Sequence, residues 1–577
     1  MMEPFRPWTW KPPEEESRQK SKRVRQDAFA KVSGSAAYTR DIYLPGMLYA
    51  KILNSPYAQA RIKGMDISEA KNLPGVRDIL AYNDPDIADD NAIGIEPSAA
   101  SYKVLTLPGT ADFYQHPMGV AVVADSEEIC DSALKRIKIE WEELDFILDM
   151  HESLKPDAVR IMPEVERLDP NAEEPNIVTT EEREEGNIEK GFAEADRIIE
   201  YTIEKEWNTV AGVEALSCVA QWRDDFLDLW VHHQVDPQGN ICAYDNWTSG
   251  PTLGDAKRPL TQWSKIRLTF PFQGSLFGGL TWLAYSTCFV RLAVLLAKRA
   301  AGRPVKLIYD ESNFYCNGDD SGSYDCKIGV KNDGTITAAQ WDITGLRNPI
   351  FDKTYECTAI PNVRGTHKWP LVNKGFQMCF RHGAHACVPH GVMMDRVAAE
   401  LELDPTEVAL RNDGCRGHHW DWVTQYQKDN GFPQRWSLKE VIDAGKAAID
   451  WERKWHRPGN RKLANGKMHG LGFISVNAWD WNVFRSFASL VLRDGIVSIN
   501  GLLPNCGIDT ETGFRHCVAT ELGMKYEDVI ILQQNSDAGT FQFMPPGGSW
   551  GTTLVVSQLI MAARELKKKI LEYAVKP

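Results

Sequence analysis

The stretch that decides the fold is "KVSGSAAYTRDIYLPGMLYAKILNSPYAQARIKGMDISEAKNLPGVRDIL", residues 31–80. It contains the short apolar run "MLYAKIL" (residues 47–53), and a second run of this kind, "GVAVVAD" (residues 119–125), follows farther along the chain. Short runs rich in apolar and β-branched residues are typical of strands. We therefore expect strands at both places.

A helix is expected directly after the second run, in "DSEEICDSALKRI" (residues 125–137). Ser126 is a suitable N-cap, because its hydroxyl can accept a hydrogen bond from a free backbone N–H of the first turn. Ile129 and Ala133 then share one helical face. This alternation of strands and helices predicts a compact α+β domain over residues 27–150.

The segments on either side of this domain differ from it in composition. Residues 1–26 are polar and contain several prolines, so we expect an arm that lies on the surface or on a partner. Residues 151–185 are rich in proline and acidic residues and show little periodicity, which is typical of a linker.

The bulk properties exclude several classes of protein. The chain has 577 residues, enough for several domains, and its 65 basic and 79 acidic side chains give a net charge of -14 without a basic block. We therefore expect no nucleic-acid partner. No stretch of about eighteen apolar residues and no signal-peptide pattern occurs, so we expect a cytoplasmic protein without a membrane span.

The twelve cysteines are spread along the chain, and none of them form a C-x-x-C pair. This distribution is typical of reduced thiols rather than of a disulfide framework. It also excludes a local run of thiolates for an iron–sulfur cluster.

Two glycine-rich turns each lead into an expected helix. "FQGSLFGGLTW" (residues 272–282) precedes a helix with one apolar face, and "PPGGSWGTT" (residues 545–553) precedes another. Those faces are made by Phe289, Leu292, Ala293 and Leu296 in the first helix and by Leu559, Ala563, Leu566, Ile570 and Tyr573 in the second. Backbone N–H groups at such turns bind anions such as phosphate, although tight turning alone also explains the glycines.

A histidine-rich run, "CFRHGAHACVPHG" (residues 379–391), raises the question of a metal site. Its imidazoles and thiols are suitable ligands, but all of them fall in one short segment, whereas zinc sites usually use two separated pairs. We therefore expect no protein-ligated metal here. The following residues, "GVMMDRVAAELEL" (391–403), predict a helix, and Asp404 before Pro405 predicts the start of another.

Five stretches of the sequence resemble one family in the same order. They are residues 31–80, "YQHPMGVAVVADSEEICDSALKRIKIEWEEL" (114–144), "GNIEKGFAEADRIIEYT" (186–202), "AAGRPVKLIYDESNF" (300–314) and "MMDRVAAELELDPTEVALRN" (393–412). The chain thus resembles the molybdopterin-binding large subunits of the xanthine dehydrogenase and aldehyde oxidase family of molybdenum hydroxylases. The resemblance implies a hammerhead-like α+β domain followed by two molybdopterin-binding α+β domains, over residues 186–415 and, in part, 416–577.

The resemblance also implies residues that contact a molybdenum-bearing pterin, which in bacterial members is often extended to the cytosine dinucleotide form. "LWVHHQ" places Gln234 near the metal's ligands, and "GSLFGG" supplies Gly274, Phe277 and Gly278. The histidine-rich run takes the place of the family's "FRGFG" loop, so that Phe380 and Arg381 match while His382 replaces a glycine.

Two later loops match in part. The family's "D-x-G-Q-G" loop corresponds to "DTETG" (residues 509–513), so that Gly513 matches and Thr512 replaces glutamine. The last turn, "GGSWG", places Ser549 at the cofactor. Leu280 and Thr281 replace the lysine and glutamate that some purine-oxidising members carry, so a purine is not the expected substrate.

Three functions follow from the resemblance. The first is a catalytic subunit that adds water-derived oxygen to a carbon of a small organic substrate and passes electrons to iron–sulfur and flavin (FAD) subunits. The second is a hydratase without net redox change, containing molybdenum or tungsten, with His382 or His385 as the general acid or base. Packing or hydrogen bonding alone also explains these histidines. The third is a scaffold subunit. Family members normally continue beyond "GGSWGTT" with a piece that carries a catalytic glutamate, so we also expect a second subunit that completes the domain.

Overall fold

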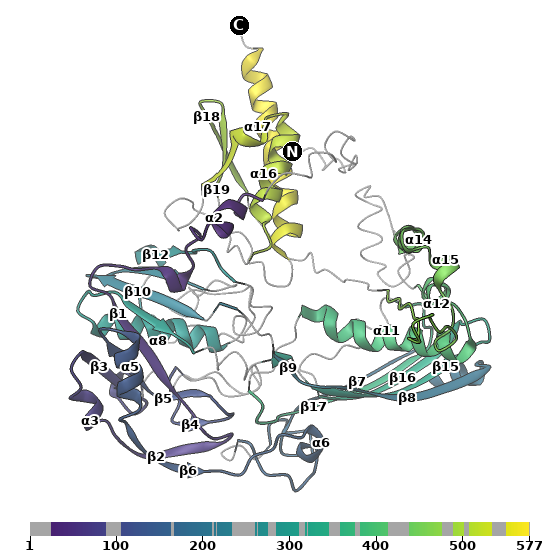
Figure 1. Ribbon diagram of the computed structural model, residues 1–577, viewed down its shortest axis with the longest axis horizontal. Helices are drawn as coiled ribbons and strands as arrows, with labels where there is room; N and C mark the ends of the chain where they lie inside the picture. The colour runs from purple at the N-terminus through teal and green to yellow at the C-terminus, as the bar shows by residue number, and fades with distance from the viewer. Residues whose placement is uncertain are drawn as a thin grey trace.

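Three parts of the chain, each built around one main sheet, make up the computed structural model (Figure 1). Strands and helices are mixed in each part, which confirms the expected α+β fold class. The structure describes residues 25–87, 106–162, 167–209, 213–214, 216–232, 260–261, 263–274, 284–310, 318–319, 321–345, 358–375, 381–413, 438–475, 488–500, 507–532 and 550–575.

A seven-stranded sheet forms the first part, and its strands come from two distant stretches of the chain. Their order across the sheet is β12 (Ile266–Thr269), β11 (Phe226–Val231), β10 (Ser217–Arg223), β13 (Val305–Ile308), β1 (Leu48–Asn54), β5 (Pro117–Ala124) and β3 (Val76–Ala81). Strand β1 pairs antiparallel with β5 and parallel with β13. The sheet therefore extends beyond the expected domain over residues 27–150.

Smaller elements cover one end of this sheet. A second sheet of the first part has the order β4 (Thr110–Ala111), β2 (Ala60–Asp66) and β6 (Lys138–Glu143), while α3 (Ser68–Lys71) and α5 (Glu127–Leu134) pack against the strands. The Ser126 hydroxyl accepts a hydrogen bond from the N–H of Ile129, which confirms the predicted N-cap. Ala133 is buried, as its place on the predicted face requires.

Helix α8 (Ala284–Arg299) lies on β10 and β13. Its predicted apolar face is confirmed, since the four side chains named for it are almost fully buried: Phe289, Leu292, Ala293 and Leu296. The indole N–H of Trp222 on β10 donates to the Val294 carbonyl at 3.1 Å and ties the helix to the sheet.

A five-stranded sheet forms the second part. Its order is β7 (Ile177–Glu185), β17 (Val363–Pro370), β16 (Ile336–Gly345), β15 (Gly322–Val330) and β8 (Arg197–Lys205). Residues 177–185, which we expected to belong to a linker, thus form an edge strand paired with β17. The β-branched start "IVTT" suits a strand, and the acidic remainder "EEREE" is tolerated because an edge strand exposes one side to water.

Helix α11 (Arg381–Leu401) packs against this sheet and begins ten residues before the helix that the sequence predicts. The run from Arg381 to Gly391 is therefore the first half of a long helix, not a loop. Met393 and Val397 are buried under the sheet, as predicted. Helix α12 (Pro405–Arg411) follows with Asp404 as its N-cap.

The third part joins a three-stranded sheet to two helices. The sheet has the order β18 (Ser489–Arg493), β19 (Ile496–Asn500) and β20 (Val529–Leu532), and α16 (Thr510–Leu522) and α17 (Trp550–Ala574) pack together beside it. Leu559 and Ala563 are buried, whereas Tyr573 is 79% exposed. The predicted apolar face of α17 is therefore covered only over its first half.

Short elements connect these parts. They are α2 (Ala28–Val32), η2 (Thr39–Asp41), α6 (Met150–Ser153), α7 (Ile188–Ala193), β9 (Asn208–Thr209), η5 (Trp263–Lys265), β14 (Gly318–Asp319), α14 (Leu438–Ile449), α15 (Trp451–Lys454) and η6 (Tyr526–Asp528). Among the helices that the structure describes, none combines the length and the apolar character needed to cross a membrane.

Asp404 joins two helices, which makes it a sensitive position for stability. Its carboxylate accepts from the Thr406 N–H at 2.8 Å and from the indole N–H of buried Trp451 at 2.8 Å. Asp404→Ala is expected to destabilise this region by about 2–4 kcal/mol, because it removes a cap and leaves a buried donor unpaired. Ser126→Ala, which removes one cap bond only, should cost about 1 kcal/mol. Urea unfolding measures the loss of unfolding free energy in each variant, and hydrogen exchange in α12 and α15 locates the effect of Asp404→Ala. Equal losses for the two variants would contradict the role of Asp404 in joining these helices.

Candidate functional site

The first residues of the glycine-rich turn are held in place from several sides. The Phe272 N–H donates to the Ala37 carbonyl at 3.1 Å, and the buried Gln273 side chain donates to the Val231 carbonyl at 3.1 Å. These bonds attach the segment after β12 to the N-terminal residues and to the end of β11. The start of the turn is therefore fixed by tertiary contacts and not by its own sequence.

Gly274, the first glycine of the turn, has both of its backbone polar groups occupied by buried side chains. Its N–H donates to the Glu214 carboxyl group. Nε2 of His232 lies 3.3 Å from its carbonyl oxygen and 3.4 Å from Oε2 of Glu214. With the proton on Nε2, His232 faces both acceptors at once. A Cβ at position 274 would lie 2.8 Å from Cβ of Glu214, so the position requires glycine.

Glu214 is ionised less readily than an ordinary glutamate. Burial raises its pKa to about 7, against hydrogen bonds from the backbone of Gly274 and Thr39, which lower it, while Asp41 adds a smaller raising effect. Its side chain is only 9% exposed. Near neutral pH this carboxyl group therefore exchanges between its protonated and ionised forms.

A cavity of about 590 Å³ opens beside this pair of side chains. It is lined by Tyr38, Arg40, Asp41, Val213, Glu214, Gly274, Tyr309 and Asp310. Its walls thus come from four places in the sequence: η2, the residues before β10, the turn after β12 and the end of β13. The mixture of aromatic, acidic and basic side chains is typical of a site for a polar ligand.

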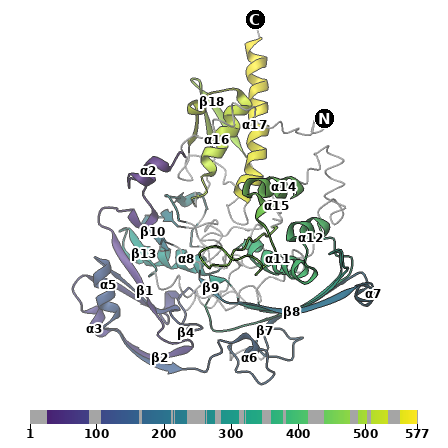
Figure 2. The ribbon, with the colours of Figure 1, turned by 45° about the vertical axis from the view of Figure 1, so that its right-hand side comes forward.

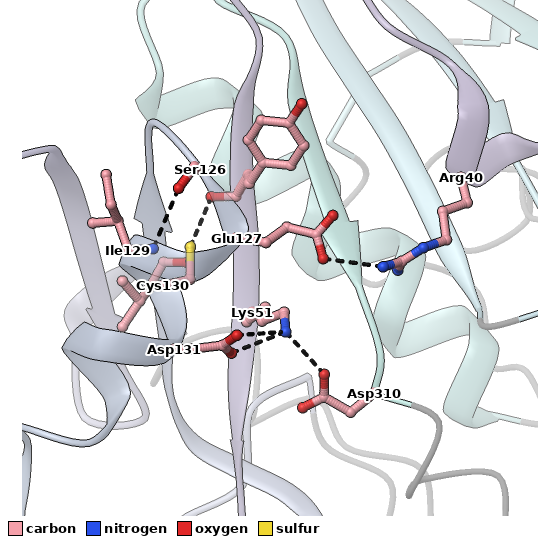
Figure 3. A network of polar contacts seen from close by, with 10 residues as sticks. Arg40, Lys51, Ser126, Glu127, Ile129, Cys130, Asp131 and Asp310 are labelled. Carbon is pink, nitrogen blue, oxygen red and sulfur yellow. Dashed lines mark hydrogen bonds and ion pairs between the residues drawn. The ribbon is translucent and has the colours of Figure 1, made fainter.

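A network of ion pairs fixes the wall of the cavity (Figure 3). Lys51 on β1 lies 2.9 Å from Asp131 of α5 and 3.1 Å from Asp310, and Arg40 lies 3.2 Å from Glu127. Burial lowers the pKa of Lys51, but the two carboxylates outweigh this effect and raise it overall. Two of the charged residues that line the cavity, Arg40 and Asp310, are therefore held by partners in the first part of the fold.

Three helices that begin within or just after the quoted motifs have their first turns toward the middle of the molecule. In Figures 1 and 2, α8, α11 and α17 each have their first turn on the side that faces the central region, and their last turns point outward. The N-terminal end of a helix carries a partial positive charge and free N–H groups. The arrangement therefore favours an anionic ligand in the central region.

The first turn of α16 is tied to neighbouring residues through the side chain of Thr512. Asp509 has a φ of 57°, and its carboxylate accepts a hydrogen bond of 2.7 Å from the Thr512 hydroxyl. That hydroxyl also accepts from the Gln26 N–H at 2.9 Å, so its donor and one acceptor position are both used. Gly513 has open space around it, since an added Cβ would meet nothing within 4 Å.

Comparison with known proteins gives the same picture for the whole chain. Residues 33–145 match the family model for the a/b hammerhead domain of aldehyde oxidase and xanthine dehydrogenase, and residues 256–413 and 444–576 match two models for a molybdopterin cofactor-binding domain. The chain belongs to this family, among its molybdopterin-binding large subunits. The named members of the family are molybdenum oxidoreductases.

Individual relatives agree with this assignment. The chain is 24% identical to the xanthine dehydrogenase molybdenum-binding subunit of Escherichia coli O157:H7, over 96% of this chain and 72% of that protein. It is 27% identical to the nicotinate dehydrogenase large molybdopterin subunit of Eubacterium barkeri, over 68% of this chain and 88% of that protein.

Solved structures show the same fold. The aldehyde oxidoreductase of Desulfovibrio gigas superposes with a TM-score of 0.74 at 21% identity, covering 96% of this chain and 61% of that one. The carbon monoxide dehydrogenase of Oligotropha carboxidovorans superposes with a TM-score of 0.71 at 20% identity, covering 95% of this chain and 70% of that one. At these identities the likeness concerns the fold alone.

The described part of this large subunit fits a pterin cofactor that carries phosphate. Gly513 leaves open space in the first turn of α16, and the inward helix starts supply N–H donors, whereas the backbone of Gly274 is already used by Glu214 and His232. Thr512 does not offer a free hydroxyl, because Asp509 and Gln26 use it. Its predicted cofactor contact would have to use the backbone.

Several predicted site residues lie outside the described residues. They are Gln234, Phe277, Gly278, Phe380 and Ser549, and the side chains of Arg381, His382 and His385 are likewise outside. The backbone of the last three residues forms the first turns of α11. Their roles in catalysis and in cofactor binding stay predictions.

Sequence reasoning missed Glu214 and His232. Neither residue belongs to a local motif, and they are separated from Gly274 by 60 and 42 positions. His232 stands in the quoted "LWVHHQ", two residues before Gln234, so proximity to that motif was the only available signal.

Gly274→Ala is expected to destabilise the first part of the fold by about 1–3 kcal/mol, because Cβ of Glu214 cannot move aside as a flexible side-chain end would. Gly445→Ala in α14 is a matched control, since an added Cβ there meets nothing within 4 Å. Alanine at this position in an exposed helix should instead raise the free energy of unfolding by about 0.5–1 kcal/mol. Thermal unfolding measures both, and a stable Gly274→Ala variant would refute the close packing.

Glu214 should also make stability depend on pH. Its pKa rises from an ordinary value of 4.5 to about 7 on folding, so its protonated form stabilises the fold fully below about 4.5. This contribution, on the order of 3 kcal/mol, is lost as pH rises through about 7. Glu214→Gln stays neutral and should remove this part of the pH dependence. The thermal unfolding temperatures of both proteins between pH 4.5 and 8.5 provide the measurement, and parallel curves would contradict the assignment.

Proposed function

We propose that this chain is the molybdopterin-binding catalytic subunit of a multi-subunit molybdenum hydroxylase. The enzyme would hydroxylate a carbon centre of a small organic substrate with oxygen derived from water. The observation that carries the proposal is the inward direction of α8, α11 and α17, because α8 follows, and α11 and α17 begin within, segments that match the family's cofactor loops. Such helix starts suit the phosphate of the pterin.

The residues of the chain would position the cofactor and the substrate. When bound, a molybdenum pterin supplies a two-electron oxidation of carbon. We propose that the turn opened by Gly274, as far as Gly278, and the first turn of α16 at Gly513 contact the cofactor through backbone groups. Arg381, at the first turn of α11, offers a planar set of donors to an oxygen or a phosphate. His382 and His385 lie in the same two turns and are the proposed proton carriers.

Partner subunits are part of the proposal. Related proteins are named as large or molybdenum-binding subunits, which supports an assembly in which iron–sulfur and flavin subunits accept the electrons. The relatives are named for different substrates: xanthine, nicotinate and nicotine. Leu280 and Thr281 argue against a purine here, and a small organic substrate of another class is proposed.

Metal analysis and acceptor dependence test this function. The complex is purified with its partner subunits, its molybdenum, tungsten and pterin nucleotide contents are measured, and turnover is followed with and without an artificial electron acceptor. About one equivalent of molybdenum and strict dependence on the acceptor are expected. Turnover without an acceptor would instead establish the hydratase, and metal far below one equivalent would establish the scaffold.

Arg381→Ala is expected to lower cofactor occupancy severalfold while the fold is retained, because no other side chain type replaces a bidentate guanidinium. Pterin and molybdenum contents of the purified complex are the measurement. Arg411→Ala serves as control, since Arg411 forms only an exposed ion pair with Asp333 at 2.9 Å. Full occupancy in the Arg381→Ala complex would remove this residue from the proposed site.

A further inference from the structure

Glu214 and His232 contact Gly274 from two sides, and the proposed function gives neither side chain a role. The carboxyl group accepts from the Gly274 N–H, and the imidazole faces the Gly274 carbonyl at 3.3 Å. Each of these two side chains is almost fully buried. The residue that opens the glycine-rich turn is thus held at both its donor and its acceptor by groups that can gain or lose a proton.

The surroundings make this pair sensitive to charge. From η2, Asp41 accepts from the Tyr38 N–H at 2.9 Å and Arg40 pairs with Glu127. From the end of β13, Asp310 pairs with Lys51, and Tyr38 and Tyr309 complete the facing groups. The charges of Arg40 and Asp310 are therefore already matched by their own partners. The Glu214 carboxyl group is left facing the backbone of Gly274 and Thr39 and the imidazole of His232.

We propose that Glu214 and His232 are positioning residues that hold the glycine-rich turn at Gly274, and that the protonation state of Glu214 sets how tightly the turn retains a phosphate-bearing cofactor. The inference rests on the proposed function, because it takes the turn to be a cofactor contact. It adds a pH-dependent control that is separate from the chemistry of the reaction.

The neutral form of the pair favours retention of an anion. A protonated Glu214 places no negative charge behind the turn, and Nε2–H of His232 then serves the Gly274 carbonyl. Ionisation puts a negative charge beside the turn and attracts Nε2–H of His232 toward Oε2, which is 3.4 Å away. Both changes weaken binding of a phosphate, one through repulsion and one through a looser turn.

The experiment uses the purified complex with its native cofactor. Release of pterin after dilution is followed by fluorescence at pH 6, 7 and 8.5, with molybdenum content as a second readout. The wild-type complex should release pterin about tenfold faster at pH 8.5 than at pH 6, as expected when one negative charge is added near a phosphate in a partly screened site. The Glu214→Gln variant keeps an acceptor for the Gly274 N–H and should release pterin slowly at all three pH values.

Two further variants separate charge from packing. Glu214→Ala lacks the acceptor and should release pterin quickly at every pH. Glu204→Gln is the control, because Glu204 on β8 accepts from the Ser323 hydroxyl at 2.8 Å, outside this cavity, and it should behave as the wild type does. Hydrogen exchange of residues 266–274 adds a readout that does not need the cofactor: exchange should rise with pH in the wild type beyond the rise seen in Glu214→Gln.

The outcomes distinguish this inference from the proposed function. If the wild-type complex retains pterin and Glu214→Gln shows the same pH dependence of release and exchange, the positioning role is wrong while the cofactor assignment stands. If the wild-type complex contains no pterin at any pH, the proposed function fails and the control of retention fails with it. Pterin release that is independent of pH in the wild type also overturns the inference.

Discussion

The parallel pairing of β1 with β13 is the constraint on which the site depends. It joins Leu48 to Val305 and Ala50 to Leu307, and so connects the N-terminal α+β region to strands more than two hundred residues later. Strand β10 pairs with β13, β11 pairs with β10, and β12 pairs with β11. Glu214 precedes β10, His232 follows β11, and the turn at Gly274 follows β12. Without this pairing, the two halves of the cavity wall would belong to separate sheets.

The electrostatic arrangement around the cavity follows from that sheet. Lys51 projects from β1 at the place where β13 ends, so that it reaches both Asp131 on α5 and Asp310 (Figure 3). A lysine with a side chain only 10% exposed is stable in this place because two carboxylates surround it. Asp310 is thereby neutralised. Burial instead drives Glu214 toward its protonated form, since no lysine or arginine in the part of the chain that the structure describes pairs with it.

Sequence alone predicted the local features well and the distant ones poorly. The N-cap at Ser126 and the buried face of α8 follow from rules that act within one helical turn, and both are confirmed. Strand β7 was taken for part of a linker because its acidic residues hide a pattern that only its pairing with β17 explains. Glu214 and His232 were missed for a similar reason. Their chemistry arises from burial against Gly274, and burial is a property of the assembled sheet.

Thr512 shows how a departure from a family pattern can serve the fold. Read as a sequence, its replacement of glutamine in a cofactor loop suggests altered chemistry. In the structure its hydroxyl binds Asp509 and the Gln26 N–H, and Arg515 donates to the Gln26 side chain at 3.0 Å. Arg25 adds a hydrogen bond of 2.9 Å to the Gly507 carbonyl. The N-terminal residues are thus fastened to the start of α16. Both the donor and one acceptor position of the Thr512 hydroxyl are therefore used in holding the N-terminal residues to α16, which gives this side chain a structural role.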